Sequence, residues 1–269
     1  MSFGLGFGFP RMLRVAGTAW TPANLGSALS LWLDASDSST ITLNGSTVSQ
    51  WNDKSGNARN ASQATAAAQP TYTLNGLNGK PVLTFDGIND NMAVNYNYGG
   101  NAATLYAVAA RFSGGNTEQF IFSSYGGTGN LIAPMWIKGA ATDQWSSYGG
   151  AALSFAPGGV IVPTNGQGFI LGIDSSITDV VLNMYTNGAL TAQYPGTVRF
   201  SGGGARNFIG AEVDGASRFL NGYVTEIVQI ESRLSTTDRQ RLEGYLAWKW
   251  GLEANLPAGH PFRNIPPTV

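Results

Sequence analysis

Residues 219–251 read FLNGYVTEIVQIESRLSTTDRQRLEGYLAWKWG, and this stretch decides the fold. It carries three signals in order: a Gly turn at 221–222, a strand over 223–230, and a helix that begins after Ser235 and ends at Gly251. The strand is apolar on both of its alternating faces, which is typical of a central strand buried on both sides.

The faces of this strand follow from its period of two. On a regular strand Tyr223 and Ile227 share one face, and Val224, Val228 and Ile230 share the other. The sequence therefore predicts that each set packs against a different layer of the protein.

The helix that follows has a start signal and an apolar stripe. Ser235 stands at the N-cap position with Asp238 three residues later, an arrangement that satisfies free N–H groups of the first turn. The apolar side chains then recur at helical spacing, at Leu242, Tyr245, Leu246 and Trp250. No other segment predicts a helix as clearly, so a single C-terminal helix has to fit into a fold built otherwise from strands and turns.

Composition excludes several classes of protein. The net charge is −1, only 12% of the 269 residues are charged, and there is no Cys. Nucleic-acid binding depends on clustered Lys and Arg, so no nucleic-acid partner is expected. Without Cys there is no disulfide framework, thiolate metal site or Cys nucleophile. No run reaches the roughly 18 apolar residues that a membrane span requires, so no membrane insertion is expected.

The remainder of the chain predicts strands at short intervals. About a dozen segments alternate in polarity and are separated by Gly, Asn, Asp and Ser turns, with Asn187-Gly188 as the strongest hairpin signal. The Ala/Gln stretch over 61–69 is interpreted as a loop. This pattern favours an all-β, two-sheet antiparallel jelly-roll sandwich with one C-terminal helix.

The first residues form a unit of their own. Phe3, Leu5, Phe7 and Phe9 alternate with Gly, so one face of an extended segment is bulky and the other is bare. The segment lacks the basic start of a signal peptide and is interpreted as part of the mature protein. Two interpretations stay open: a flexible leader, or an apolar tether that packs on this chain or on another subunit. The predicted organisation is a tether over 1–20 and one domain over 21–269.

Four separated blocks carry a resemblance to a known family. They are LWLDASD at 31–37, WNDKSGN at 51–57, GKPVLTFDGINDNM at 79–92, and the stretch from Gly222 with LPAGHPF at 256–262. In this order they resemble the LamG-like branch of the concanavalin A-type jelly rolls. The resemblance implies two curved antiparallel sheets, a first strand beside the last, and a helix packed at one end. It also implies an association with bacteriophage virion proteins and bacterial surface proteins.

Catalytic residues are not expected. Glycosidases on this fold resemble one another in a strand that places two carboxylates on one face, about 5 to 5.5 Å apart. Here Glu226 and Glu231 are an odd number of residues apart, which sends them to opposite faces of a regular strand. The single His260 lies in a loop, where a packing role is favoured, and no G-x-S-x-G motif is present. The sequence therefore predicts a protein that is not an enzyme.

Two kinds of binding site remain as candidates. LamG-like domains can hold Ca²⁺ on rim loops, and Asp86, Asn89 and Asp90 supply suitable oxygen atoms, although tight turns favour the same residue types. No other cofactor is expected. Four aromatic residues in Gly-rich surroundings are candidates for a sugar platform, with burial in the core or in an interface as the alternative; they are Tyr125, Trp136, Trp145 and Tyr148.

The preferred hypothesis is a non-enzymatic virion structural protein, as capsid decoration, head fibre or tail component. Its expected partners are other virion proteins bound through the N-terminal segment, and its own copies in a homo-oligomer. Its expected location is the virion surface, with the bacterial cell surface or secretion as the alternative. The alternative function is a carbohydrate-binding or adhesion module that recognises host-surface glycans, and a glycan-cleaving enzyme that uses Glu226 is the third hypothesis.

Overall fold

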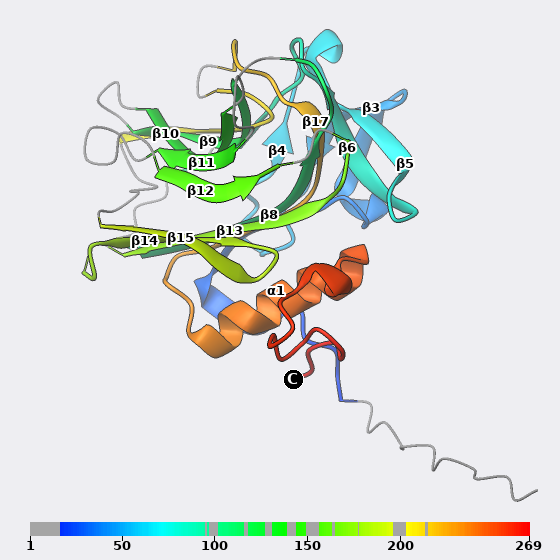
Figure 1. Ribbon diagram of the computed structural model, residues 1–269. Helices are drawn as coiled ribbons and strands as arrows, with labels where there is room; N and C mark the ends of the chain where they lie inside the picture. Colours follow the sequence, from blue (N-terminus) through cyan, green and yellow to red (C-terminus); the bar gives the residue numbers. More distant parts are fainter. Residues whose placement is uncertain are drawn as a thin grey trace, which may run out of the picture.

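The described part of the chain folds as an antiparallel β-sandwich with one α-helix against it (Figure 1). The computed structural model describes residues 17–94, 96, 102–115, 118–126, 131–138, 144–148, 156–162, 165–176, 178–195, 203–212 and 215–269. Within them, no helix is long and apolar enough to cross a membrane.

Two layers of strands make up the sandwich. In the first sheet β17 pairs with β8 on one side and with β6 and β1 on the other, and β8 continues through β13 and β14 to β15. The second sheet runs from β2 through β3, β4, β7, β16, β9, β10 and β11 to β12. The central position predicted for the strand over 223–230 is therefore confirmed.

The first sheet consists of β1 (Leu29–Asp34), β5 (Thr71–Leu77), β6 (Lys80–Asp86), β8 (Ala102–Arg111), β13 (Phe169–Ser176), β14 (Val181–Thr186), β15 (Ala189–Pro195) and β17 (Asn221–Ile230). The second sheet consists of β2 (Ile41–Asn44), β3 (Thr47–Trp51), β4 (Ala61–Ser62), β7 (Met92–Val94), β9 (Glu118–Gly126), β10 (Leu131–Lys138), β11 (Gln144–Tyr148), β12 (Ala156–Ile161) and β16 (Gly203–Ile209). The helical segments are α1 (Thr236–Trp250) and the short 3-10 turns η1 (Pro22–Ala28), η2 (Ser38–Thr40), η3 (Ala66–Ala68) and η5 (Glu253–Asn255).

Local signals in the sequence account for several element ends. The Ser235 side chain accepts a hydrogen bond from the Asp238 N–H, and Gly251 ends α1 with a φ of 67°. Asn187 and Gly188, with φ of 48° and 77°, form the predicted hairpin turn between β14 and β15. These predictions are confirmed.

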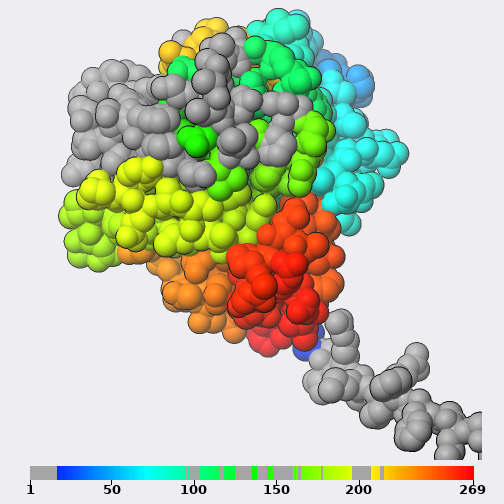
Figure 2. Space-filling view, in the orientation of Figure 1, coloured from blue at the N-terminus to red at the C-terminus, as the bar shows by residue number. Residues whose placement is uncertain are grey.

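Two apolar cores result from this arrangement. The larger core lies between the sheets and includes Leu33 and Ile227 from the first sheet and Trp51 and Met92 from the second. The other core fills the space between the outer face of the first sheet and α1, which crosses that sheet in Figure 1. Figure 2 shows the segment after α1, in red, on the same side as the helix. The helix therefore covers a face of the sheet.

A bulge in β17 corrects the predicted faces of that strand. Val224 pairs with Ala109 and Glu226 pairs with Val108, so Thr225 is an extra residue. The alternation shifts at this point: Tyr223 packs with α1, whereas Val224 lies in the core between the sheets. The prediction that Tyr223 shares a face with Ile227 was therefore wrong, because a regular period of two does not hold across an inserted residue.

The N-terminal part of the described chain runs beside the C-terminus. Ala19 forms a bridge with Thr268, and the Trp20 N–H donates to the Pro267 carbonyl at 3.1 Å. The Trp20 side chain is buried. The body therefore already includes residues 17–20, which the sequence had assigned to the tether.

Candidate functional site

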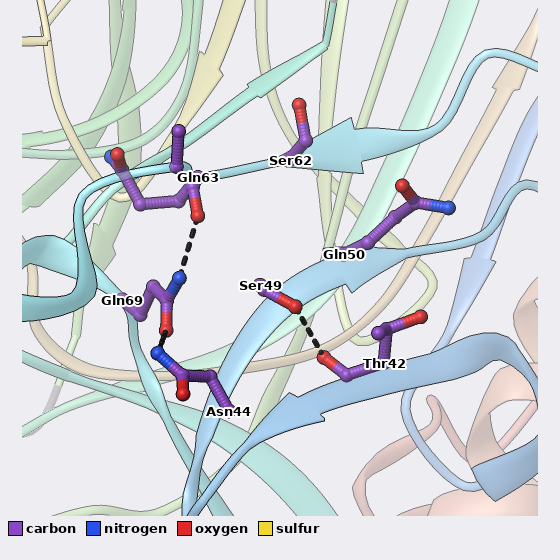
Figure 3. A pocket seen from close by; sticks show the side chains of 8 residues that line it. Thr42, Asn44, Ser49, Gln50, Ser62, Gln63 and Gln69 are labelled. Carbon is purple, nitrogen blue, oxygen red and sulfur yellow. Dashed lines mark hydrogen bonds between the residues drawn. The ribbon is translucent and has the colours of Figure 1, made fainter.

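A polar hollow of about 470 Å³ lies over β2, β3, β4 and the loop that follows β4 (Figure 3). We call it the amide hollow. Its lining side chains are amides and hydroxyls with one Ala; they are Thr42, Asn44, Ser49, Gln50, Ser62, Gln63, Ala64 and Gln69. None of these described lining residues carries an ionisable group.

A bulge in the β2–β3 hairpin shapes the wall of the amide hollow. Thr42 pairs with Gln50 and Leu43 pairs with Val48, which leaves Ser49 as the extra residue. Val48 and Trp51 are buried in the core, and the two polar residues between them both line the hollow. A regular strand sends neighbouring side chains to opposite faces, so the bulge places a second polar side chain in the wall.

Gln69 links the segments that line the amide hollow through hydrogen bonds of its side chain. Its side chain is buried, its Oε1 accepts from Asn44 Nδ2 at 3.2 Å and from Thr47 Oγ1 at 2.8 Å, and its Nε2 donates to the Gln63 carbonyl at 2.7 Å. Figure 3 shows this amide between Gln63 and Asn44. A buried amide with these partners is fixed in orientation, so it positions the side chains around it.

Several polar atoms of the lining remain available to a ligand. Gln50 Nε2 donates to Asn52 Oδ1 at 2.6 Å, which orients the Gln50 side chain. Four polar atoms of the lining make no hydrogen bond within the described chain. They are Gln50 Oε1, Asn44 Oδ1 and the side-chain hydroxyl oxygens of Thr42 and Ser62. Amide and hydroxyl groups both donate and accept hydrogen bonds, which suits a ligand rich in hydroxyl groups.

The structure describes the side chains of two of the four aromatic residues that were candidates for a sugar platform. Trp145 is 0% exposed, belongs to the core between the sheets, and donates from Nε1 to Thr186 Oγ1 at 2.8 Å. Trp136 is 8% exposed, with its ring centroid 5.5 Å from that of Phe120. The burial of these two rings agrees with the alternative interpretation, in which they pack in the interior and do not form a sugar platform. Strand alternation and a covering neighbour remove their faces from solvent. The side chains of Tyr125 and Tyr148 lie outside the described residues.

The apolar residues expected to anchor the predicted tether also lie outside the described residues. They are Phe3, Leu5, Phe7 and Phe9. Its role stays a prediction.

The predicted calcium ligands form a tight turn after β6. Asp86 Oδ1 accepts from the backbone N–H groups of Ile88, Asn89 and Asp90 at 2.8, 3.2 and 3.3 Å, and Asp90 Oδ2 accepts from the Asp86 N–H at 3.0 Å. Burial, together with the nearby Asp86 charge, raises the pKa of Asp90 to about 7. In the described part of the chain no three His, Asp or Glu side chains gather to hold a metal. These hydrogen bonds are those of a tight turn, and calcium binding by these residues stays a prediction.

The two carboxylates considered for catalysis have different surroundings. Glu226 is fully buried between the first sheet and α1, whereas the Glu231 side chain is 42% exposed and pairs with Arg59 at 2.9 Å. Burial raises the pKa of Glu226, against the opposite effect of Lys249 at 2.8 Å. The two carboxylates therefore do not face a common ligand.

His260 has a structural role in the described fold. Its Nδ1 accepts from the Phe262 N–H at 3.2 Å, so its Nε2 carries a proton and donates to Glu243 Oε2 at 3.1 Å. The ring is buried beside the middle of α1, which agrees with the packing role expected for it.

The sequence did not predict the amide hollow. Residues 61–69 were interpreted as a loop, but they contain β4, η3 and the buried Gln69. The alternation of Thr42 and Asn44 was an available signal for a polar strand face. The contact that closes the hollow joins residues 25 apart, Asn44 and Gln69, and no local pattern indicates it.

Comparison with solved structures agrees with the β-sandwich fold of this chain. No protein-family model and no curated protein sequence matches the chain. Among solved structures it is similar to Trypanosoma rangeli sialidase in complex with sialic acid, with a TM-score of 0.59, 16% identity, and coverage of 87% of this chain and 36% of that one.

A second structural neighbour is matched over nearly its whole length. It is domain 4 of an extracellular arabinanase from Geobacillus stearothermophilus in complex with arabinotriose, with a TM-score of 0.56, 14% identity, and coverage of 80% of this chain and 98% of that one. At these identities the likeness shows the fold. It agrees with a concanavalin-like sandwich and gives no support to the expected virion origin.

The prediction that this protein is not an enzyme is contradicted by the comparison. The neighbours include the sialidase and a mutant of it that displays trans-sialidase activity, also at 16% identity. The chain spans only about a third of the length of these enzymes, 36% in both cases. The expectation that this protein is not an enzyme is therefore withdrawn, and at this identity the likeness to the sialidase shows the fold.

Proposed function

We propose that this chain is a carbohydrate-binding module and that the amide hollow takes a glycan. The observation that carries the proposal is the lining: amides and hydroxyls fixed by Gln69 and by the β2–β3 bulge, with four polar atoms left for a ligand. The arabinanase domain supports it, since that domain has the same fold and is described in complex with arabinotriose.

The expected affinity is low for a single site. Four hydrogen bonds of about 1 kcal/mol each supply about 4 kcal/mol, which corresponds to a Kd of about 1 mM. Functional attachment at this affinity requires several copies or several sites acting together. Because no ionisable group lines the hollow, the expected ligand is neutral and binding is expected to be insensitive to NaCl.

The test is a titration of a neutral oligosaccharide panel, containing arabinotriose, lactose and maltotriose, followed by two-dimensional NMR. We expect saturable shifts of the side-chain amide signals of Asn44 and Gln50. Ala64→Trp, at an exposed lining position, fills the hollow and should abolish these shifts. Ala66→Trp is the matched control, since Ala66 is exposed and does not line the hollow.

Two results contradict the proposal. One is the absence of binding to every neutral glycan on a multivalent array. The other is binding that Ala64→Trp and Ala66→Trp leave equally unchanged, because the glycan then sits elsewhere.

A further inference from the structure

A second uncharged hollow, of about 490 Å³, lies where α1 ends. We call it the helix-end hollow; the β5–β6 turn, the 165–168 segment, β17 and the residues after α1 line it. The side chains and glycines that matter for the argument are Asn78, Gly166, Gln167, Tyr223, Gly251 and Asn255. None of the described residues that line it carries a carboxylate, an ammonium or a guanidinium group.

The walls of the helix-end hollow are fixed by hydrogen bonds between distant segments. Asn78 Nδ2 donates to the Trp250 carbonyl at 2.6 Å and to the Gly251 carbonyl at 3.2 Å, which ties the β5–β6 turn to the end of α1. The Tyr223 hydroxyl donates to the Gly166 carbonyl at 2.7 Å, which ties the 165–168 segment to β17. The site is therefore formed before any ligand arrives, which lowers the entropic cost of binding.

Glycines bring backbone close to this hollow. Gly251 has a φ of 67°, the left-handed conformation that ends α1, and a Cβ atom there would lie 2.9 Å from Asn78 Nδ2. At Gly168 a Cβ atom would lie 2.8 Å from the Leu77 side chain. Neither position accepts a larger residue without a shift of its neighbours, so the walls keep their present shape.

Free amide groups face the ligand space. In the described structure the side chains of Gln167 and Asn255 make no hydrogen bond, and both residues are exposed. Each amide supplies donors and an acceptor. The hollow therefore offers the same chemistry as the amide hollow, on a different sheet and from different residues.

The electrostatics of the helix end select the class of ligand. The C-terminus of an α-helix carries a partial negative charge, which disfavours an anion beside the last carbonyl groups. No carboxylate lines the hollow to pair with a cation, so a cationic ligand lacks its partner. A neutral ligand with hydroxyl groups brings no negative charge to the helix end and needs no carboxylate partner.

From this geometry we infer that the helix-end hollow is a second binding site for a neutral saccharide. The inference rests on the proposed function for the ligand class, but it uses none of the residues of the amide hollow. A chain with two weak sites gains avidity on a surface that displays many glycans.

The test uses the full chain and the panel of arabinotriose, lactose and maltotriose, with the side-chain amide signals of Gln167 and Asn255 as reporters. We expect saturable shifts at these amides in the Ala64→Trp variant, in which the amide hollow is filled. Gln167→Ala should weaken this second event about two- to tenfold, as expected for one lost hydrogen bond. Asn255→Trp should abolish it, and Ala254→Trp, at an exposed neighbour that does not line the hollow, is the matched control.

The outcomes separate the two sites. Shifts confined to Asn44 and Gln50 overturn the second site and leave the proposed function standing. Shifts confined to Gln167 and Asn255 support the second site and overturn the amide hollow. If no saturable shift is seen at either hollow, both sites are overturned.

Discussion

Glu226→Gln tests whether the carboxylate between the first sheet and α1 is structural. Glu226 Oε1 accepts from Trp32 Nε1 at 2.7 Å and Tyr245 OH at 3.0 Å, and Oε2 accepts from Trp250 Nε1 at 2.6 Å and lies 2.8 Å from Lys249 Nζ. Glutamine keeps one acceptor oxygen and places an NH₂ group against donors on the other side. The ammonium group of Lys249 is then left with Asp34, at 2.6 Å, as its carboxylate partner.

The expected loss follows from the burial of this group. Removing one partner of a buried ion pair costs about 3–5 kcal/mol. Lys249 keeps Asp34, but the buried donors on one side of the glutamine then face an NH₂ group and lose their acceptor. For a chain of 269 residues each kcal/mol lowers the melting temperature by roughly 2–4 °C, so the expected fall is about 6–20 °C. The control is Glu231→Gln, which removes a partly exposed pair with Arg59 and should cost at most about 1 kcal/mol.

Urea unfolding followed by tryptophan fluorescence measures both variants. Trp32 and Trp250 both donate to Glu226, so the signal reports on the same interface. Saccharide binding by the folded Glu226→Gln protein should stay unchanged, since this carboxylate lines neither hollow. The reasoning is refuted if the two variants lose the same stability, or if Glu226→Gln loses binding while it keeps its stability.

Two further predictions concern the turn after β6. The pKa of Asp90 is about 7 in the folded chain against a usual 3.8, so the folded state holds an extra proton between these values and stability should fall as pH rises through that window. Asp90→Asn should remove this dependence, and urea midpoints at pH 5 and pH 8 should then converge; a wild-type protein that is more stable at pH 8 contradicts the prediction. For calcium, Asp86 Oδ1 already accepts three backbone N–H groups, so the interpretation as a tight turn predicts that a chelator leaves the melting temperature unchanged. A rise with added Ca²⁺ that Asp86→Asn abolishes would favour the metal.

Local signals predicted the parts of the fold that depend on local geometry. Ser235 caps α1 and Gly251 ends it because a helix terminus leaves free N–H and C=O groups whatever the rest of the chain does. The Asn187-Gly188 hairpin formed as predicted because both residues adopt positive φ at low cost. The apolar alternation of residues 223–230 was enough to indicate a central strand.

Pairings between distant segments determined what local patterns could not. The faces of β17 depend on the extra residue at Thr225, which exists only in register with β8. The burial of Trp145 depends on the sheet that covers it, and its aromatic character alone is equally consistent with a surface platform.

The candidate sites belong to this second group. Their amides are ordinary polar residues in the sequence, and they become sites only because Gln69 joins β2 to the segment after β4, and because Asn78 joins the β5–β6 turn to the end of α1. The sequence by itself determined the sandwich, its hairpins and its capped helix, since these arise from backbone preferences and local periodicity. The tertiary structure alone decided where uncharged hydrogen-bonding groups gather, because that depends on contacts such as those of Asn44 with Gln69 and of Asn78 with Gly251, which are 25 and 173 positions apart in the sequence.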